Sequence, residues 1–168
     1  MRRLILLRHA KSSWKHADVE DHDRPLNKRG RAAAPVMARW LRDHGHLPDA
    51  ILCSSSVRTQ ETVERMRDTA PDLPKPVVTP DLYHAAPAAI LSAIRRLSSQ
   101  AAATGMVVGH EPGMGILART LAGEDAAKIA AFPTAAAAVF RFDIENWADA
   151  APENARLIAF AKPRDLMA

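Results

Sequence analysis

The chain has 168 residues, 48% of them hydrophobic and 25% charged, which excludes extensive disorder and predicts one domain over residues 1–168. Its net charge of +4 is spread along the sequence without a basic run or interleaved aromatic residues, so we expect no nucleic-acid partner; no apolar run approaches the roughly 20 residues that cross a membrane. The single cysteine, Cys53, excludes an internal disulfide and, without a secretory signal, predicts a cytoplasmic protein.

Short apolar runs alternate with amphipathic helical patterns over most of the chain. The predicted elements, in chain order, are strand 3–7, helix 28–44, strand 49–53, helix 56–69, strand 76–79, helix 87–98, strand 105–108 and helix 113–122. Asn27 is a suitable N-cap for the first helix, and Gly45 stands just past its end. Pro35 predicts a kink or an irregular first turn in that helix.

The predicted strands are apolar along their whole length, which is typical of strands that are buried on both faces. Two further strand-like segments, 138–144 and 155–161, close the chain and are separated by a polar loop. We therefore predict an α/β fold, a single domain with a mostly parallel central sheet, helices on both faces and at least one antiparallel strand.

Basic side chains follow three of the predicted strands at the point where each strand ends. Arg8-His9 comes directly after the first strand, Arg58 lies at the start of the helix that follows strand 49–53, and His110 follows strand 105–108. Because ligands of an open α/β sheet bind beyond the carboxyl ends of its strands, we expect two arginines and two histidines at one rim of the sheet.

This rim suits a phosphoryl dianion. Arginine side chains bind phosphate oxygens bidentately, and helix N-termini add backbone donors. Ser54 and its two neighbouring serines can cap the helix at 56–69 and offer hydroxyl groups to a substrate. A neutral imidazole amid this positive charge is suited to attack phosphorus, giving a phosphohistidine that water then hydrolyses. On these residues alone, structural roles for the histidines and arginines remain an alternative.

Several segments resemble, in the same order, those of the histidine phosphatase superfamily, which has the phosphoglycerate-mutase-like fold. The superfamily has Arg-His-Ala or Arg-His-Gly after its first strand, Arg-Thr-x-x-Thr after its second and Gly-His before a helix. Over nearly the full chain, the sequence is most similar to the short SixA-type phosphohistidine phosphatases. The segments are "LILLRHAKSSW", "DHDRPLNKRGRAAAPVMARWL", "ILCSSSVRTQET", "VVGHEPGM" and "AFPTAAAAVFRFD".

The resemblance implies a role for each basic residue at the rim. His9 is the expected nucleophile, which carries the phosphoryl group during turnover. Arg8, Arg58 and His110 are expected to surround the phosphate and to stabilise charge on its equatorial oxygens. The same resemblance implies a phosphatase that needs no cofactor and no metal.

Two roles stay open within the family pattern. Arg24 resembles an arginine that this branch places near the pocket, although a salt bridge with Asp21 or Asp23 is an alternative. Larger members of the superfamily use a carboxylate as general acid; here Glu111 is the most economical candidate, with Asp21 and Asp81 as alternatives. A weak acid favours phosphohistidine over sugar phosphates, because a protonated imidazole nitrogen leaves more readily than an alkoxide.

Other chemistries fit the sequence less well. A cysteine-phosphatase loop places five residues between Cys and Arg, whereas Cys53 and Arg58 are separated by four, none of them glycine. The acidic segment 18–23 lacks the spacing of a ligand set and is followed by Arg24, so we expect a solvated loop there and no metal site. The roles of four further residues stay open: Lys11, Ser12, Ser13 and Trp14.

We therefore predict a phosphatase that acts through phospho-His9, most readily on phosphohistidine in proteins and so in signal transduction. The alternatives are a small-molecule phosphomonoesterase of the same superfamily and a phosphate-binding module without turnover. A mutase is disfavoured, because the chain lacks extra segments that would hold and reorient a sugar phosphate. We expect a monomer whose partner is a phosphorylated protein or a small phosphorylated metabolite.

Overall fold

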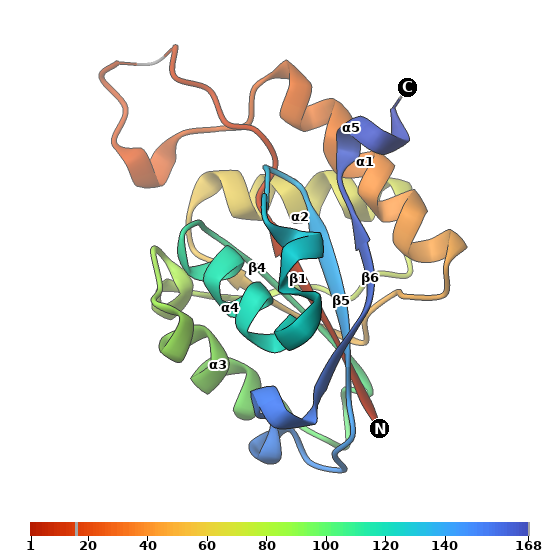
Figure 1. The fold of residues 1–168 in the computed structure, drawn as a ribbon. Coiled ribbons are helices and arrows are strands. Elements are labelled where there is room, and N and C mark those ends of the chain that lie inside the picture. Colours follow the sequence, from red (N-terminus) through yellow and green to blue (C-terminus); the bar gives the residue numbers. More distant parts are fainter. Residues whose placement is uncertain (16, 168) are drawn as a thin grey trace.

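A six-stranded mixed sheet lies at the centre of the protein (Figure 1). The structure is a computed structural model that describes residues 1–15 and 17–167. Across the sheet the strands follow the order β3-β2-β4-β1-β5-β6. Their bounds are β1 (Arg2–Arg8), β2 (Ala50–Ser54), β3 (Val77–Thr79), β4 (Thr104–Gly109), β5 (Ala137–Phe142) and β6 (Ala155–Ala161).

Three of the strand pairings are parallel and two are antiparallel. β4 pairs in parallel with both β1 and β2, and β2 pairs in parallel with β3. β5 runs antiparallel to both of its neighbours, β1 and β6. The predicted mostly parallel sheet with an antiparallel strand near the end of the chain is thus confirmed, and each strand lies within two residues of its predicted bounds.

Helices follow the strands much as the periodicity predicts. The Asn27 side chain caps α1 by accepting a hydrogen bond from the Gly30 N–H, and Pro35 lies within that helix. The helix predicted over 87–98 ends early, because the Leu97 N–H bonds to the Ile94 carbonyl in a tighter turn. The helices are α1 (Lys28–Asp43), α2 (Val57–Thr69), α3 (Pro87–Arg95), α4 (Gly113–Ala122) and the short α5 (Pro163–Leu166), which was not predicted.

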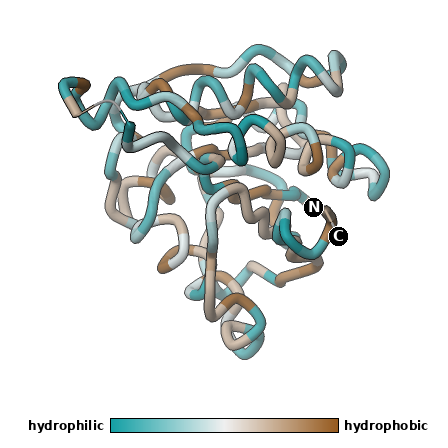
Figure 2. Tube along the Cα trace, turned by 90° about the horizontal axis from the view of Figure 1, so that it is seen from above, coloured by the Kyte–Doolittle hydropathy of each residue, from teal (hydrophilic) through white to brown (hydrophobic). Residues whose placement is uncertain are grey.

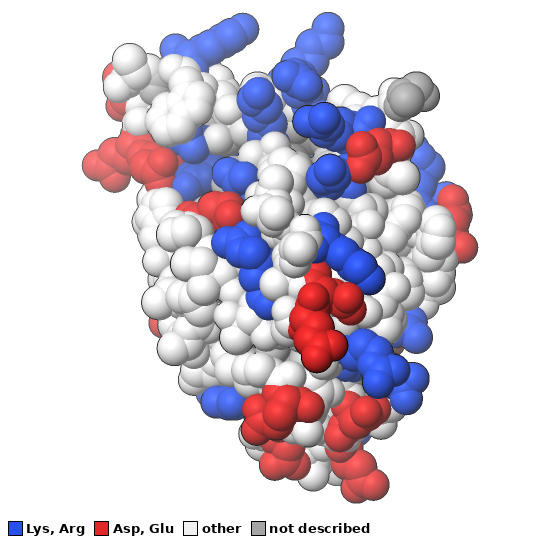
Figure 3. All heavy atoms as spheres, viewed as in Figure 1, with Lys and Arg blue, Asp and Glu red and all other residues white. Residues whose placement is uncertain are grey.

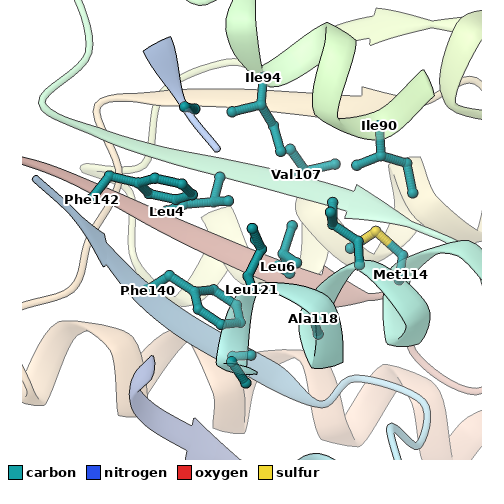
Figure 4. Packing of buried hydrophobic residues seen from close by; sticks show 14 of the residues in the cluster. Leu4, Leu6, Ile90, Ile94, Val107, Met114, Ala118, Leu121, Phe140 and Phe142 are labelled. Carbon is teal, nitrogen blue, oxygen red and sulfur yellow. The ribbon is translucent and has the colours of Figure 1, made fainter. Parts of the chain in front are cut away.

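The central strand β1 separates two hydrophobic cores. Leu4 and Leu6 lie on one face of the sheet, where they pack with Met114 of α4 and other residues of α3, α4 and β5 (Figure 4). Ile5 and Leu7 lie on the other face and pack with residues of α1 and α2. Since alternate residues of a strand point to opposite faces, four consecutive apolar residues are all buried, each contributing roughly 1.5–3 kcal/mol.

The helices cover the sheet with apolar faces and leave polar faces outside. Seen from above, hydrophilic and hydrophobic stretches alternate along them (Figure 2). No helix in the described part of the chain is both long enough and apolar enough to cross a membrane. Because α2 and α4 follow β2 and β4 with short connections, their first turns lie at the edge of the sheet where β1 also ends.

Candidate active site

The three strand ends meet at one hollow of about 390 Å³. All four basic residues that the sequence predicts at the rim, from Arg8 to His110, line this hollow, which we call the phosphate pocket. Ser54 and Asp81, which the sequence suggested as a substrate-binding residue and a general acid, are not among the described residues that line the hollow. The lining residues are Arg8, His9, Lys11, Ser12, Trp14, Asp21, Arg24, Arg58, His84, His110, Glu111 and Thr134.

His9 is buried and is held in one orientation by the chain that follows β1. Its Nδ1 lies 2.7 Å from the Ala10 carbonyl oxygen. Since a carbonyl oxygen only accepts hydrogen bonds, Nδ1 carries the proton, and Nε2 of the neutral ring has a free lone pair. Burial, and then the positive charges of Arg58 and Arg8, lower the pKa of His9 to about 4. The ring is therefore neutral at pH 7.

The backbone around His9 is tied to both neighbouring elements. The His9 N–H bonds to the Gly109 carbonyl at 3.1 Å. The Ala10 N–H bonds to the Thr62 hydroxyl at 3.0 Å, and that hydroxyl donates to the Arg58 carbonyl at 2.7 Å. The second threonine of the Arg-Thr-x-x-Thr segment therefore fixes the end of β1 against the first turns of α2, and does not face a ligand.

His110 lies at the end of β4 with its ring centroid 5.3 Å from that of His9. Its Nδ1 lies 3.3 Å from Nη2 of Arg58, and its Nε2 lies 2.8 Å from the Ser54 hydroxyl. Because guanidinium only donates, Nδ1 accepts and Nε2–H donates to Ser54. Burial, and then the charges of His9 and Arg58, lower the pKa of His110 to about 3. Ser54 is fully buried, so any effect on a substrate passes through His110.

Arg58 is 2% exposed and is fixed by Asp21. Its Nη1 donates to the Asp21 carbonyl at 2.7 Å, and its Nη2 donates to the Asp21 carboxylate at 3.1 Å. Burial by itself raises the pKa of that carboxyl group. Hydrogen bonds from Tyr83 and His84, together with the charge of Arg58, outweigh burial and hold the pKa well below its usual range. Asp21 is therefore an anion that positions arginines, and a poor proton donor.

Arg24 lies at the pocket and also forms an ion pair with Asp21. It is 7% exposed and lines the pocket, while its Nε lies 3.4 Å from the Asp21 carboxylate. Its Nη2 donates to the Ser12 hydroxyl at 2.8 Å, and its guanidinium lies 3.4 Å from the centre of the Trp14 ring.

Ser13, the residue between Ser12 and Trp14, is buried, and its hydroxyl accepts a hydrogen bond from the Lys15 N–H. Of the four residues whose roles the sequence left open, Ser12 and Trp14 therefore hold the Arg24 side chain in place.

Several guanidinium nitrogens in the pocket are buried and have no hydrogen-bond partner among the residues that the structure describes. They are Nε of Arg8, Nε and Nη1 of Arg24, and Nε of Arg58. The other end of Arg8 donates to the Phe132 carbonyl at 3.1 Å. Unpaired buried donors are costly, so a bound anion with several acceptor oxygens would relieve that cost. The arrangement is suited to hold a tetrahedral oxyanion beside Nε2 of His9.

The candidates for general acid differ in their surroundings. Glu111 lines the pocket, but its carboxylate accepts the Gly115 N–H in the first turn of α4. Asp81 is exposed in the turn after β3. His84, which sequence reasoning missed, lines the pocket with its Nε2 3.0 Å from the Asp21 carboxylate. His84 could have been found by looking for polar side chains soon after the end of strand 76–79, as was done for the other three strands.

Cys53 has none of the properties of a nucleophile. Its side chain is fully buried in β2, and its Sγ contacts the Ser54 carbonyl. Burial raises the pKa of the thiol to about 12, so it stays protonated at neutral pH. Within residues 1–15 and 17–167, no cluster of three or more His, Cys, Asp or Glu side chains is arranged to hold a metal ion.

Comparisons with known proteins agree with one another. The family model "Histidine phosphatase superfamily (branch 1)" matches residues 4–86. The uncharacterized protein MT1313 of Mycobacterium tuberculosis is 39% identical in an alignment of 165 positions that covers 94% of this chain and all of that protein. A SixA structure from Nakamurella multipartitia is 28% identical with a TM-score of 0.86, covering 96% of each chain. One from Agrobacterium tumefaciens is 31% identical with a TM-score of 0.81, covering 96% of this chain and 98% of that one.

Proposed function

Because the chain belongs to the histidine phosphatase superfamily, in its SixA-type branch, we propose that it hydrolyses phosphohistidine on proteins through a phosphoryl group carried by His9. Family membership supports phosphatase activity, and we propose in addition that the substrate is phosphohistidine. The observation that carries the mechanism is the state of His9, a buried neutral imidazole whose Nε2 lone pair is free in a pocket of arginines.

In the first step, Nε2 of His9 attacks phosphorus, and the bond from phosphorus to the substrate nitrogen breaks. Donors on Arg8 and Arg58 offset charge on the equatorial oxygens. The His9 ring becomes cationic, and its Nδ1–H stays bonded to the Ala10 carbonyl, which stabilises that charge. In the second step, water attacks phosphorus, the bond to Nε2 breaks, and inorganic phosphate leaves with the ring neutral again.

The substrate assignment follows from the proton that the leaving nitrogen needs. Asp21 is held as an anion, and one oxygen of the Glu111 carboxylate accepts the Gly115 N–H. Neither is suited to protonate an alkoxide, whereas a phosphohistidine nitrogen demands less help. We propose that His84, which lines the pocket and has a side chain that is 51% exposed, donates this proton to the leaving nitrogen.

A protein substrate fits the shape of the pocket. Trp14 stacks on Arg24 but remains 77% exposed, so it leaves the pocket mouth open. A phosphohistidine on a protein surface must enter such a mouth while still attached to its own chain. We further propose that the enzyme acts without metal, as a cytoplasmic monomer.

The test is a side-by-side assay of a phosphohistidine protein, phosphoramidate and a panel of metabolite phosphates, with and without a chelator. His9→Ala and Arg58→Ala should each lose most turnover, and His44→Ala, an exposed histidine elsewhere, should retain it. Wild-type enzyme should yield an acid-labile, base-stable phosphoenzyme. Substantial turnover by His9→Ala would refute the mechanism. Preference for a metabolite would favour the small-molecule phosphatase, and binding without turnover the phosphate-binding module.

A further inference from the structure

A second hollow of about 470 Å³ lies beside the phosphate pocket, between α1, α5 and the loop that precedes β5. Lys11 and Thr134 line both hollows, so the two are immediate neighbours on the surface. We call the second hollow the basic groove, because its rim carries Lys11, Lys28, Arg29 and Arg164. Figure 3 shows basic side chains gathered at the end of the molecule where Figure 1 places α1 and α5.

The described residues do not compensate the charge of the basic groove. None of the four rim cations makes a salt bridge with any residue in the described ranges, and each is exposed. The described lining includes no acidic residue. The rim therefore forms a local region of positive potential that attracts acidic groups. In the phosphate pocket, by contrast, Asp21 and Glu111 offset part of the positive charge.

The floor of the basic groove is apolar. Here the floor means the apolar lining residues between the cations, which are Ala32, Ala33, Pro133, Pro163 and the half-exposed Met167. A ligand that fits must carry negative charges and also an apolar group, which a peptide with acidic and aliphatic residues does. No aromatic residue is found among the described lining residues, so the stacking that single-stranded nucleic acids use is missing.

We propose that the basic groove binds an acidic segment of the protein substrate that lies beside its phosphohistidine. This inference rests on the proposed function, because it places the phosphorylated residue at His9 while neighbouring residues occupy the groove. Contacts outside the pocket fix the substrate chain and speed encounter through charge attraction. They are not needed by a small phosphoramidate, which reaches only the phosphate pocket.

The first arm of the test measures binding without phosphorylation. A fluorescent peptide with aspartate, glutamate and leucine residues is titrated with wild type and with the double variant R29E/R164E. The control K75E/R156E makes the same change in net charge at exposed positions away from the groove. We expect R29E/R164E to weaken binding by about tenfold and the control by less than twofold.

The second arm measures kcat/KM on phosphohistidine peptides with acidic or neutral flanks and on phosphoramidate. R29E/R164E should lower kcat/KM about tenfold on the acidic peptide only. An equal loss on the neutral peptide or on phosphoramidate would overturn the inference, as would an oligonucleotide of equal charge that competes as well as the acidic peptide. If wild type turns over no phosphorylated substrate, the proposed function fails, while the binding arm still decides whether the groove takes acidic peptides.

Discussion

Lowering the pH from 7.5 to 5.0 should destabilise this protein, because His9 and His110 are neutral when it is folded. Burial is the main reason that the pKa of His9 falls to about 4 and that of His110 to about 3, from an ordinary value of 6.5. In the unfolded chain both rings accept protons below pH 6.5. The stability that neutral rings contribute is therefore fully present above pH 6.5 and is lost as the pH falls toward the folded pKa values.

The size of the loss follows from these pKa values. At pH 5.0 an unfolded imidazole is almost fully protonated and a folded one with a pKa near 4 is not, which costs about 2 kcal/mol of unfolding free energy. The second ring adds somewhat less than another ~2 kcal/mol, because part of the lowering at His110 arises from charge on His9. Together the losses are a large part of a typical stability of about 5–15 kcal/mol.

Urea unfolding at both pH values measures this loss. We compare wild type with His9→Gln, His110→Gln and the exposed-histidine control His44→Gln. Each pocket variant should show a pH-dependent loss smaller than wild type by about 2 kcal/mol, whereas the control should match wild type. The same pH-dependent loss in all four proteins would mean that the two buried rings are not held neutral. His9 would then lack the free Nε2 lone pair that a nucleophile needs.

Two further predictions concern Cys53, which we expect to take no part in turnover, and His84, which we expect to donate a proton. Because the Cys53 thiol is buried with its pKa raised to about 12, an alkylating agent applied to the native enzyme, or Cys53→Ala, should leave turnover within about twofold; a loss above tenfold would restore a thiol mechanism. If His84 supplies a proton to the leaving nitrogen, His84→Ala should lower kcat on phosphohistidine by about a hundredfold but on p-nitrophenyl phosphate, whose leaving group departs as an anion, by less than threefold. Equal losses on both substrates would assign His84 a structural role through Asp21.

The sequence alone predicts the sheet and the residues at its rim because both depend on local signals. The apolar run in β1 sets its burial, and the residues that follow, Arg8 and His9, must then emerge at the strand end. Parallel pairing of β1, β4 and β2 brings Arg58 and His110 to the same edge, so one topological rule converts three separate segments into one pocket.

The remainder of the site depends on contacts that no periodicity encodes. Asp21 reaches Arg58 across 37 residues and His84 across 63, and it does so from a 3₁₀ turn in an irregular loop. Sequence reasoning could name Asp21 as a carboxylate, but the hydrogen bonds that keep it anionic belong to the folded state. Ser54 follows the same logic, since only the position of its hydroxyl shows that it supports His110.

The charge of the phosphate pocket defines which phosphorylated groups it suits. Its lining includes four cationic side chains and two carboxylates, which together carry a net charge of +2, and the buried His9 and His110 add none because both are neutral. A phosphoryl dianion on one nitrogen or oxygen balances that charge, whereas a phosphodiester, which carries one negative charge, leaves one positive charge unpaired in a partly desolvated site. Protonated imidazoles would raise the mismatch further. The same burial that keeps the Nε2 lone pair of His9 free, as the proposed mechanism requires, therefore also matches the pocket to terminal phosphoryl groups.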